Sequence, residues 1–402
     1  MTGPAQQAQC PFGGDALPET DFDHNSTALS EQNLWQAYEE LRSLGPVAHS
    51  RHHGGYYVVT GFDDVKSALR DKETFVSGHG HRIPVVGVPR AVPIDYDGSL
   101  HREYRRIMIS ALTPKRIAAM KDSLRDLIGR LVSDFRAAGG GDVIAAVALP
   151  LPLQVLVEVV GFSEATVTEL RELTEAMWDV VNDVDYDEAR QGIRALVDGE
   201  IARHRAEPRD DFLSRLLDER VEDRPITDDE IARTLITMAI AGHETTMNAA
   251  SSLFWLLARD RDLQERLRAD PGLAPQFVEE MLRLRTPAQN FARHTTNQVV
   301  VGETPIPEDA RVLLSFAAAN RDPVVFADPD RFDVTRATRA HLAFGWGAHQ
   351  CIGATLARTE LKILLETLVA HPAFALDGDA TFHSLQGGIH YGPHRLPIRF
   401  ES

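Results

Sequence analysis

Positive charge is scarce in this sequence: 42 lysine and arginine residues stand against 59 acidic ones, and the formal net charge is −17. Proteins that bind the phosphate backbone of nucleic acids need clustered Lys and Arg, so the composition excludes nucleic acid as a main partner. Lysine is rare even among the basic residues. This preference for arginine, together with many alanines, is typical of a bacterial genome rich in GC.

Cysteine and long hydrophobic runs are also scarce. Cys10 and Cys351 are the two cysteines, so the sequence carries no disulfide framework of the kind found in small secreted proteins. The first 30 residues lack a basic stretch followed by an apolar run, and we therefore expect no signal peptide. The most apolar stretch, 143–162, is interrupted by Pro150 and Glu158, which makes it a poor membrane span. We expect a cytoplasmic protein without membrane contact.

Hydrophobic residues are abundant, at 43% of 402, which suffices for a large folded core. No stretch looks like a linker between separate cores, and no internal repeat or low-complexity tract is present. The sequence therefore predicts one domain over 31–402, preceded by a mobile segment over 1–30.

Helical patterns dominate, so the expected fold is mainly α with a smaller β region. We expect helices at 31–44, 63–70, 100–111, 114–137, 152–160, 164–182, 186–205, 273–285 and 352–371. A short strand is expected at 56–60 and a β-rich segment at 286–316, because both are rich in β-branched and aromatic residues. The segment 77–98 reads as a long loop, and long ordered loops are usually functional.

The clearest helix is expected to begin after Thr227 and to run to about Arg259. Thr227 and Glu230 form a capping box, a sequence signature of a helix N-terminus. At 1.5 Å per residue the helix is roughly 45–50 Å long, which is longer than a small domain is wide. It must therefore cross the whole molecule.

The centre of this long helix reads Ala241-Gly242-His243-Glu244-Thr245-Thr246, between apolar runs. Glycine within a helix costs about 1 kcal/mol relative to alanine, and a carboxylate among apolar residues is costly without partners. Two local rules broken together indicate a functional site. We expect the Thr245 hydroxyl to bond the carbonyl of Ala241. Taken alone, Glu244 and Thr245 are equally consistent with a solvated helix face.

Residues 344–353 read Phe-Gly-Trp-Gly-Ala-His-Gln-Cys-Ile-Gly, just before another helical pattern. A cysteine near a helix N-terminus is stabilised as thiolate by free N–H groups and the positive end of the dipole. The glycines permit tight turns and the close approach of a flat ligand. A buried structural cysteine after a glycine-rich turn is the alternative interpretation of Cys351.

The cysteine segment resembles the motif F-G-x-G-x-H-x-C-x-G of the cytochrome P-450 superfamily and matches all six fixed positions. The segment 241–246 resembles the family's A-G-x-E/D-T-T, and the family's E-x-x-R pattern has a counterpart in 280–283. The resemblance extends over about 33–400. It implies the cytochrome P-450 fold, with the long central helix crossing the haem, and a haem-thiolate monooxygenase activity.

The resemblance also implies a haem b cofactor with Cys351 as the iron ligand. Glu244 and Thr245 would be the catalytic acid–alcohol pair that delivers protons to oxygen. The other residues implied in haem binding are Phe344 and Ala241, and, as partners of the propionates, His101, Arg105, Arg293 and His349.

A structural network is implied as well. Glu280, Arg283 and Arg331 are expected to form a buried charge cluster. Breaking such a cluster typically costs about 3–5 kcal/mol.

By resemblance the substrate pocket is expected to contain Val86, Val88, Thr237, Ile240, Gln289, Phe291 and Ile389, which suggests a small or medium-sized, largely apolar organic substrate. Arg82 and Arg90 could pair with a substrate carboxylate, although solvated arginines are the simpler interpretation.

The partners are expected to be O₂ and a separate electron donor of the ferredoxin type, because only about 50 residues follow Cys351. We expect a monomer. A peroxygenase or haem isomerase of the same fold, and a haem-thiolate gas sensor without turnover, are the alternatives. The intact Glu244-Thr245 pair disfavours both.

Overall fold

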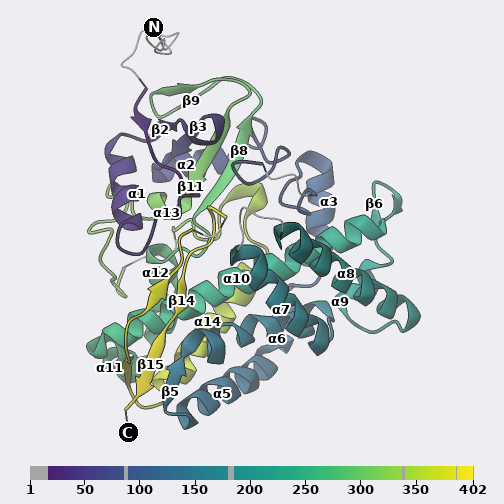
Figure 1. Ribbon diagram of the computed structural model, residues 1–402, viewed down its shortest axis with the longest axis vertical. Helices are drawn as coiled ribbons and strands as arrows, with labels where there is room; N and C mark the ends of the chain where they lie inside the picture. The colour runs from purple at the N-terminus through teal and green to yellow at the C-terminus, as the bar shows by residue number, and fades with distance from the viewer. Residues whose placement is uncertain (1–16, 86–88, 180–184, 337–339, 386, 402) are drawn as a thin grey trace.

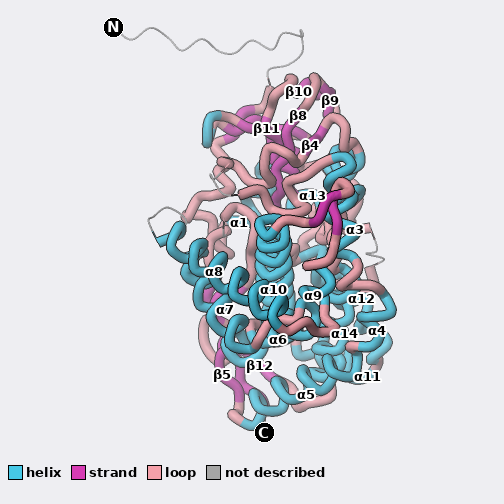
Figure 2. Tube along the Cα trace, turned by 90° about the vertical axis from the view of Figure 1, so that its right-hand side faces the viewer, coloured by secondary structure: helices cyan, strands magenta, loops and turns pink. Residues whose placement is uncertain are grey.

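The computed structural model describes residues 17–85, 89–179, 185–336, 340–385 and 387–401. The chain folds with its main sheet at one end and most of its helices at the other (Figures 1 and 2). Cys10, Val86 and Val88 lie outside the described residues. No helix in the described part combines the length and apolar content needed to cross a bilayer.

Helices make up most of the described chain, as predicted. They are α1 (Leu34–Ser43), α2 (Phe62–Arg70), α3 (Gly98–Ile109), α4 (Pro114–Ala119), α5 (Lys121–Ala137), α6 (Pro150–Val160), α7 (Glu164–Asp179), α8 (Asp185–Ala206), α9 (Phe212–Leu216), α10 (Asp228–Arg259), α11 (Arg261–Ala269), α12 (Ala274–Leu284), α13 (Phe316–Ala319) and α14 (Ala354–Val369).

The largest sheet has the strand order β1-β2-β3-β11-β8-β4. Its strands are β1 (Glu19–Thr20), β2 (Val47–Ser50), β3 (Tyr56–Val59), β4 (Phe75–Val76), β8 (Asn290–Thr295) and β11 (Arg311–Ser315). The remaining strands form smaller sheets: β5 (Gly140–Asp142), β6 (Arg220–Val221), β7 (Arg224–Pro225), β9 (Val299–Val301), β10 (Thr304–Ile306), β12 (Phe374–Leu376), β13 (Thr381–Phe382), β14 (Pro393–Arg395) and β15 (Pro397–Phe400). The expected β-rich segment 286–316 contains β8 to β11.

The long helix α10 has the predicted start and end. The Thr227 side chain accepts from the N–H of Glu230, and the Glu230 side chain accepts from the N–H of Thr227, which is the capping box expected from the sequence. The helix runs through the middle of the helical part and packs against α6, α8, α12 and α14 (Figure 1). Its central position brings its mid-helix motif into the interior of the molecule.

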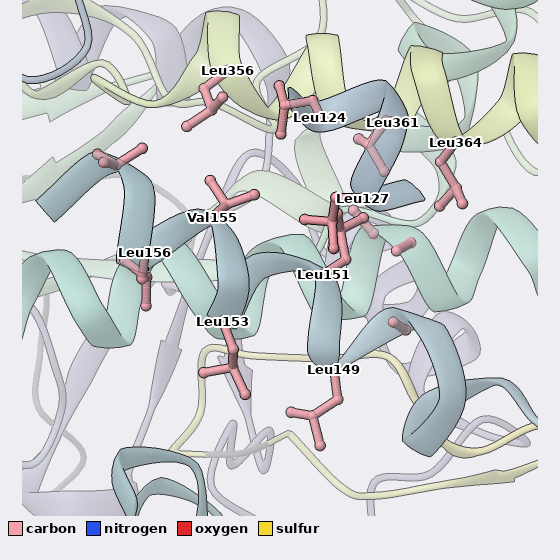
Figure 3. Close-up of a cluster of buried hydrophobic side chains, with 14 of the residues drawn as sticks. Leu124, Leu127, Leu149, Leu151, Leu153, Val155, Leu156, Leu356, Leu361 and Leu364 are labelled. Carbon is pink, nitrogen blue, oxygen red and sulfur yellow. The ribbon is translucent and has the colours of Figure 1, made fainter. Parts of the chain in front are cut away.

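The main hydrophobic core surrounds α10. Leucine and valine side chains from α5, α6 and α14 interdigitate beside it (Figure 3). The labelled members include Leu124 and Leu127 of α5, Leu151, Val155 and Leu156 of α6, and Leu356, Leu361 and Leu364 of α14. This packing holds α14, and the loop before it, in a fixed position relative to α10.

Two expectations about local structure are corrected. The helix predicted over 114–137 is interrupted at Met120, whose N–H is shared between the carbonyls of Arg116 and Ala118. The segment 17–30, expected to be mobile, is packed: β1 pairs with β2, and Phe22 and His24 are buried. Backbone pairing and apolar burial fix it, although its polar composition indicated neither.

Candidate active site

The cysteine loop, 344–353, and α10 both face one large internal cavity. The cavity has an empty volume of about 1620 Å³, part of it open to solvent, and most of its lining residues are apolar. The loop contributes Cys351 and Gly353, while α10 contributes Ala241, Gly242 and Thr245. The two motifs that stand out in the sequence are therefore brought together at one site.

The geometry of the cysteine loop depends on its glycines. The N–H of Cys351 donates to the carbonyl of Phe344 at 2.9 Å, which closes the loop. Gly345 and Gly347 adopt φ of 64° and 72°, in the left-handed region that favours glycine. A Cβ added at Gly347 would lie 2.3 Å from the carbonyl oxygen of Leu69. The loop can pack against α2 only with glycine there, and it leaves the free cysteine Cys351 inside the protein, exposed to the cavity.

Burial and the neighbouring groups shift the pKa of the Cys351 thiol in opposite directions. Burial raises the pKa of the Cys351 thiol above its ordinary value, and the N–H groups of Gly353 and Ala354 and the charges of Arg105 and Arg358 offset this rise only in part. Gly353 and Ala354 form the N-terminal end of α14, so the helix stabilises a thiolate as expected. Coordination to a metal ion deprotonates a thiol outright. The loop thus presents a sulfur that is suited to binding iron in the cavity.

The four predicted propionate partners lie together. His101, Arg105, Arg293 and His349 all line the cavity, and the His101 and His349 rings are 4.1 Å apart. Burial lowers the pKa of Arg293 to about 10 and that of His101 to about 4. The Nε2 atom of His101 is buried and has no hydrogen-bond partner among the described residues.

These basic residues fit a ligand that carries carboxylates. Arg105 donates to the carbonyl of Gln350 at 2.7 Å, and Arg293 donates to the carbonyl of Ala292 at the same distance. Two guanidinium groups that bond neutral carbonyls beside an open cavity leave room for a stronger, charged acceptor. The two propionates of haem match this donor set, and the mostly apolar lining, which includes Phe344 and Ala241, suits the ring.

The middle of α10 has the hydrogen bond expected from the sequence. The Oγ1 atom of Thr245 donates to the carbonyl of Ala241 at 2.8 Å. Ala241 and Gly242 are exposed on the cavity wall, since neither carries a side chain that would fill it. This part of the helix can therefore accept a flat group and a small ligand close to its backbone.

Glu244 does not lie on a solvated face. The side chain is buried, with a relative exposure of 1% for the residue, and burial raises its pKa well above the ordinary value. His390, which the sequence reasoning missed, lies 3.3 Å from it. In the sequence, the only feature that pointed to His390 was its position next to Ile389, in a turn that the family resemblance places near the substrate.

The predicted charge network is correct for Glu280 and Arg283 and wrong for Arg331. Both of the first two side chains are fully buried, and they pair at 2.8 Å. The Arg331 side chain is 67% exposed and pairs with Asp333, while only its carbonyl reaches Arg283. The additional cation on Glu280 is Arg336, at 3.1 Å. Both arginines precede the cysteine loop, and only the turn geometry decides which one points inward.

Replacing each of these two arginines with methionine should distinguish their contributions to stability. We expect Arg336→Met to lower the free energy of unfolding by about 1.5–3 kcal/mol, because a hydrogen bond to a charged group is lost while the aliphatic stem stays. Arg331→Met should change it by less than about 0.5 kcal/mol, as is usual for exposed positions. Urea unfolding followed by circular dichroism measures both. Equal losses in the two variants would contradict this assignment.

The predicted substrate pocket is found in part. Thr237 and Phe291 line the cavity, whereas Ile240, Gln289 and Ile389 do not belong to its lining. Gln289 is fully buried and accepts a hydrogen bond from the Tyr38 hydroxyl at 2.7 Å, so its amide serves the structure of the sheet region. Apolar residues that the sequence did not single out take part instead, among them Ile94, Met108, Pro152, Val155, Val159 and Met238.

Arg90 is occupied locally rather than held free for a substrate. Its guanidinium donates to the carbonyl of Asp95 and stacks over the Tyr96 ring, 4.2 Å from the centroid. This contact agrees with the simpler of the two interpretations of that residue.

Comparisons with known proteins identify the family. The family model for cytochrome P450 matches residues 152–271 and 272–386. The chain is 34% identical to cytochrome P450 130 of Mycobacterium tuberculosis over 86% of this chain and 89% of that protein. It is 32% identical to a steroid C26-monooxygenase of Mycolicibacterium smegmatis over 95% and 96% of the two chains. The structure of a P450 EryK mutant in complex with erythromycin B superposes with a TM-score of 0.84 at 30% identity, covering 92% and 97%.

The fold, the cysteine loop and these likenesses together define a haem-thiolate monooxygenase. The chain belongs to the cytochrome P450 family.

Proposed function

We propose that this enzyme inserts one oxygen atom from O₂ into a small or medium-sized, largely apolar organic substrate, in a hydroxylation or a related oxidation. The cofactor is haem b, and the electrons come from a separate ferredoxin and ferredoxin reductase. The protein works as a monomer in the cytoplasm.

The observation that carries the proposal is the shared cavity of Cys351 and Thr245. Haem held by a thiolate supplies oxygen activation, since the thiolate favours O–O cleavage. His101, Arg105, Arg293 and His349 would hold its propionates. Thr245 and the buried Glu244 then supply protons from the α10 side, while the apolar lining orients the substrate and excludes water.

Relatives support an organic substrate without selecting one. Their names refer to a steroid in one case and to 6-deoxyerythronolide B in another. The apolar lining, with Phe291, Met238 and Val155, favours a hydrophobic molecule. A screen of small molecules for shifts of the haem Soret band would find the compounds that fit.

The test is turnover with a surrogate ferredoxin and its reductase. With a bound substrate we expect consumption of NADPH and O₂ with formation of an oxidised product. A protein that forms product only with added peroxide would be a peroxygenase, and this result would contradict the proposal. A protein that binds haem and ligands without turnover would be a sensor, and that result would contradict it too.

The electron donor should dock on the cysteine side, where arginines offset the acidic surface. Arg106 is paired with Glu219 at 3.1 Å and Arg358 with Glu279 at 2.6 Å, which leaves the exposed Arg102 as the main contact.

Reversing this charge should slow reduction. We expect Arg102→Glu to reduce the rate of reduction by ferredoxin at low salt about 10-fold and to weaken its salt dependence, because charge pairing mainly raises the on-rate. Arg395→Glu, at an exposed position on β14, is the control. Stopped-flow reduction at several ionic strengths measures the rates. Salt-independent reduction of the unaltered enzyme would count against an electrostatic docking site.

A further inference from the structure

Two ionisable side chains from distant parts of the chain meet beside α10. Glu244 and His390 are both buried, with relative exposures of 1% and 6%, and Oε2 of Glu244 lies 3.3 Å from Nε2 of His390. Neither Glu244 oxygen has a hydrogen bond of ordinary geometry from the described residues. An ionised carboxylate in such surroundings is strongly disfavoured. We call Glu244 and His390 the buried pair.

His390 reaches this position from a turn that is fixed on both sides. The N–H of Gln289 donates to the carbonyl of Ile389 at 2.8 Å, and the N–H of Tyr391 donates to the carbonyl of Pro287 at 3.0 Å. The residues before and after His390 are thus bonded to the segment that leads into β8. The imidazole is held against α10 by backbone structure and does not depend on a mobile loop.

Burial favours the neutral form of both members of the pair. Burial raises the pKa of Glu244 well above its ordinary value and lowers that of His390 to about 3. His243 also faces His390, and burial lowers its pKa to about 4, so it adds no charge at neutral pH. In this neutral form Glu244 has an O–H group to donate. The Nε2 atom of His390 can accept it when Nδ1 carries the ring hydrogen.

We propose that His390 is a positioning residue that holds the proton of Glu244 in place and returns a proton to Glu244 after each delivery. The inference rests on the proposed monooxygenase function, which consumes protons on the Thr245 side of the cavity. It adds a third residue to the acid–alcohol pair, and this residue comes from a different element of the fold.

The proton transfers balance without any change in electrons. When the O–H bond of Glu244 breaks and the proton moves toward Thr245, the new carboxylate charge increases the proton affinity of the adjacent imidazole. A proton from solvent then bonds to Nε2 of His390. The N–H bond breaks as a new O–H bond forms on Glu244, and both side chains are neutral again.

The solvent side of the pair contains charged and titratable groups from the loop before α3. The positive charge of Arg82 faces both Glu244 and His390 and favours the transient carboxylate. The Nε atom of Arg82 donates to Nε2 of His81 at 3.3 Å, and Nδ1 of His81 lies 2.7 Å from Asp95. Arg82 and His81 are half-buried and therefore partly in contact with solvent, whereas Asp95 at the end of this chain is buried.

Infrared difference spectroscopy of the resting holoenzyme tests the pair without turnover. At neutral pH we expect a C=O stretch of a protonated carboxylic acid that is lost in Glu244→Gln. In His390→Phe this band should move to higher frequency, because the acid loses its acceptor. Glu360, whose pKa burial raises to about 8, gives a second band that Glu360→Gln identifies. If the wild type lacks the Glu244 band, or if His390→Phe leaves it unshifted, the proposal is overturned.

Kinetics test the return of the proton. His390→Gln keeps a polar side chain that cannot carry the proton, and we expect it to slow oxygen consumption on the order of 10-fold, below the usual 10² to 10⁴-fold of general acid–base groups. The loss should be larger in D₂O, and the pH profile of the rate should change. His394→Gln, at an exposed position on β14, is the control and should match the wild type.

The outcomes of the two tests separate this inference from the proposed function. An unchanged rate, pH profile and solvent isotope effect in His390→Gln would overturn the role of His390 while the enzyme remains a monooxygenase. Absence of turnover in the wild type, even with the infrared band present, would overturn the proposed function and with it the role that rests on it.

Discussion

Replacing Cys351 with histidine should abolish the red-shifted Soret band of the reduced CO complex and reduce monooxygenase turnover to background. The unaltered protein should bind one haem b and show that band, because a thiolate from the cysteine loop donates electron density to the iron. Histidine can still ligate iron but lacks this donation. Difference spectra of the reduced CO complex, recorded together with product formation, measure both effects.

The second cysteine of the sequence provides the control. Cys10→Ser should leave the CO spectrum and turnover unchanged, since Cys351 is the cysteine that lines the cavity in the described part of the chain. Circular dichroism should show the same helical content in all variants. A histidine-type CO spectrum in the wild type, or a thiolate-type spectrum in Cys351→His, would contradict the assigned ligand.

The parts of the site that were predictable from the sequence share one property: local chemistry determines them. The start of α10 follows from a capping box between Thr227 and Glu230, three residues apart. The bond from Thr245 to Ala241 follows from helical geometry, and the shape of the cysteine loop follows from glycines at positive φ. In each case neighbouring residues are sufficient to define the geometry.

The parts that were missed depend on contacts between distant residues. Arg336, and not Arg331, points inward, and this depends on where the segment before the cysteine loop meets α12. His390 lies almost 150 positions from Glu244, and no periodicity connects them. Gln289 was expected in the pocket, but a hydrogen bond from Tyr38 holds it in the buried interior. Sequence patterns define such positions only after the fold is known.

Thr245→Ala should leave haem and substrate binding intact, but the variant should consume NADPH while forming little product. Breaking the O–O bond of O₂ needs protons at the cavity side of α10. Cys351 lies on the cysteine loop, and a sulfur that binds the iron as thiolate has no proton to deliver. The hydroxyl of Thr245 lines the cavity on the α10 side, and Glu244 is buried next to it in the sequence. A hydroxyl that orders a water molecule and an adjacent acid that replenishes the proton suit this task.

Without the hydroxyl, the water should no longer be held where the proton is needed, and reduced oxygen should leave as hydrogen peroxide. General acid–base groups typically contribute 10² to 10⁴-fold, so we expect product per NADPH to fall by at least about 10-fold. Glu244→Ala should instead slow overall oxygen consumption, because it removes the source of the proton rather than its placement. Product, peroxide and NADPH must be measured together in each variant.

A threonine elsewhere on the same helix distinguishes this role from packing. The Thr234 hydroxyl donates to the carbonyl of Glu230 at 2.7 Å, the same backbone bond four residues back that Thr245 makes to Ala241, and Thr234 does not belong to the cavity lining. If the hydroxyl of Thr245 only stabilised the helix, both alanine variants would lose a little stability, and both would form as much product per NADPH as the wild type. If it positions the proton, Thr234→Ala stays coupled and Thr245→Ala releases peroxide. Coupling at the wild-type level in Thr245→Ala would remove this residue from the mechanism.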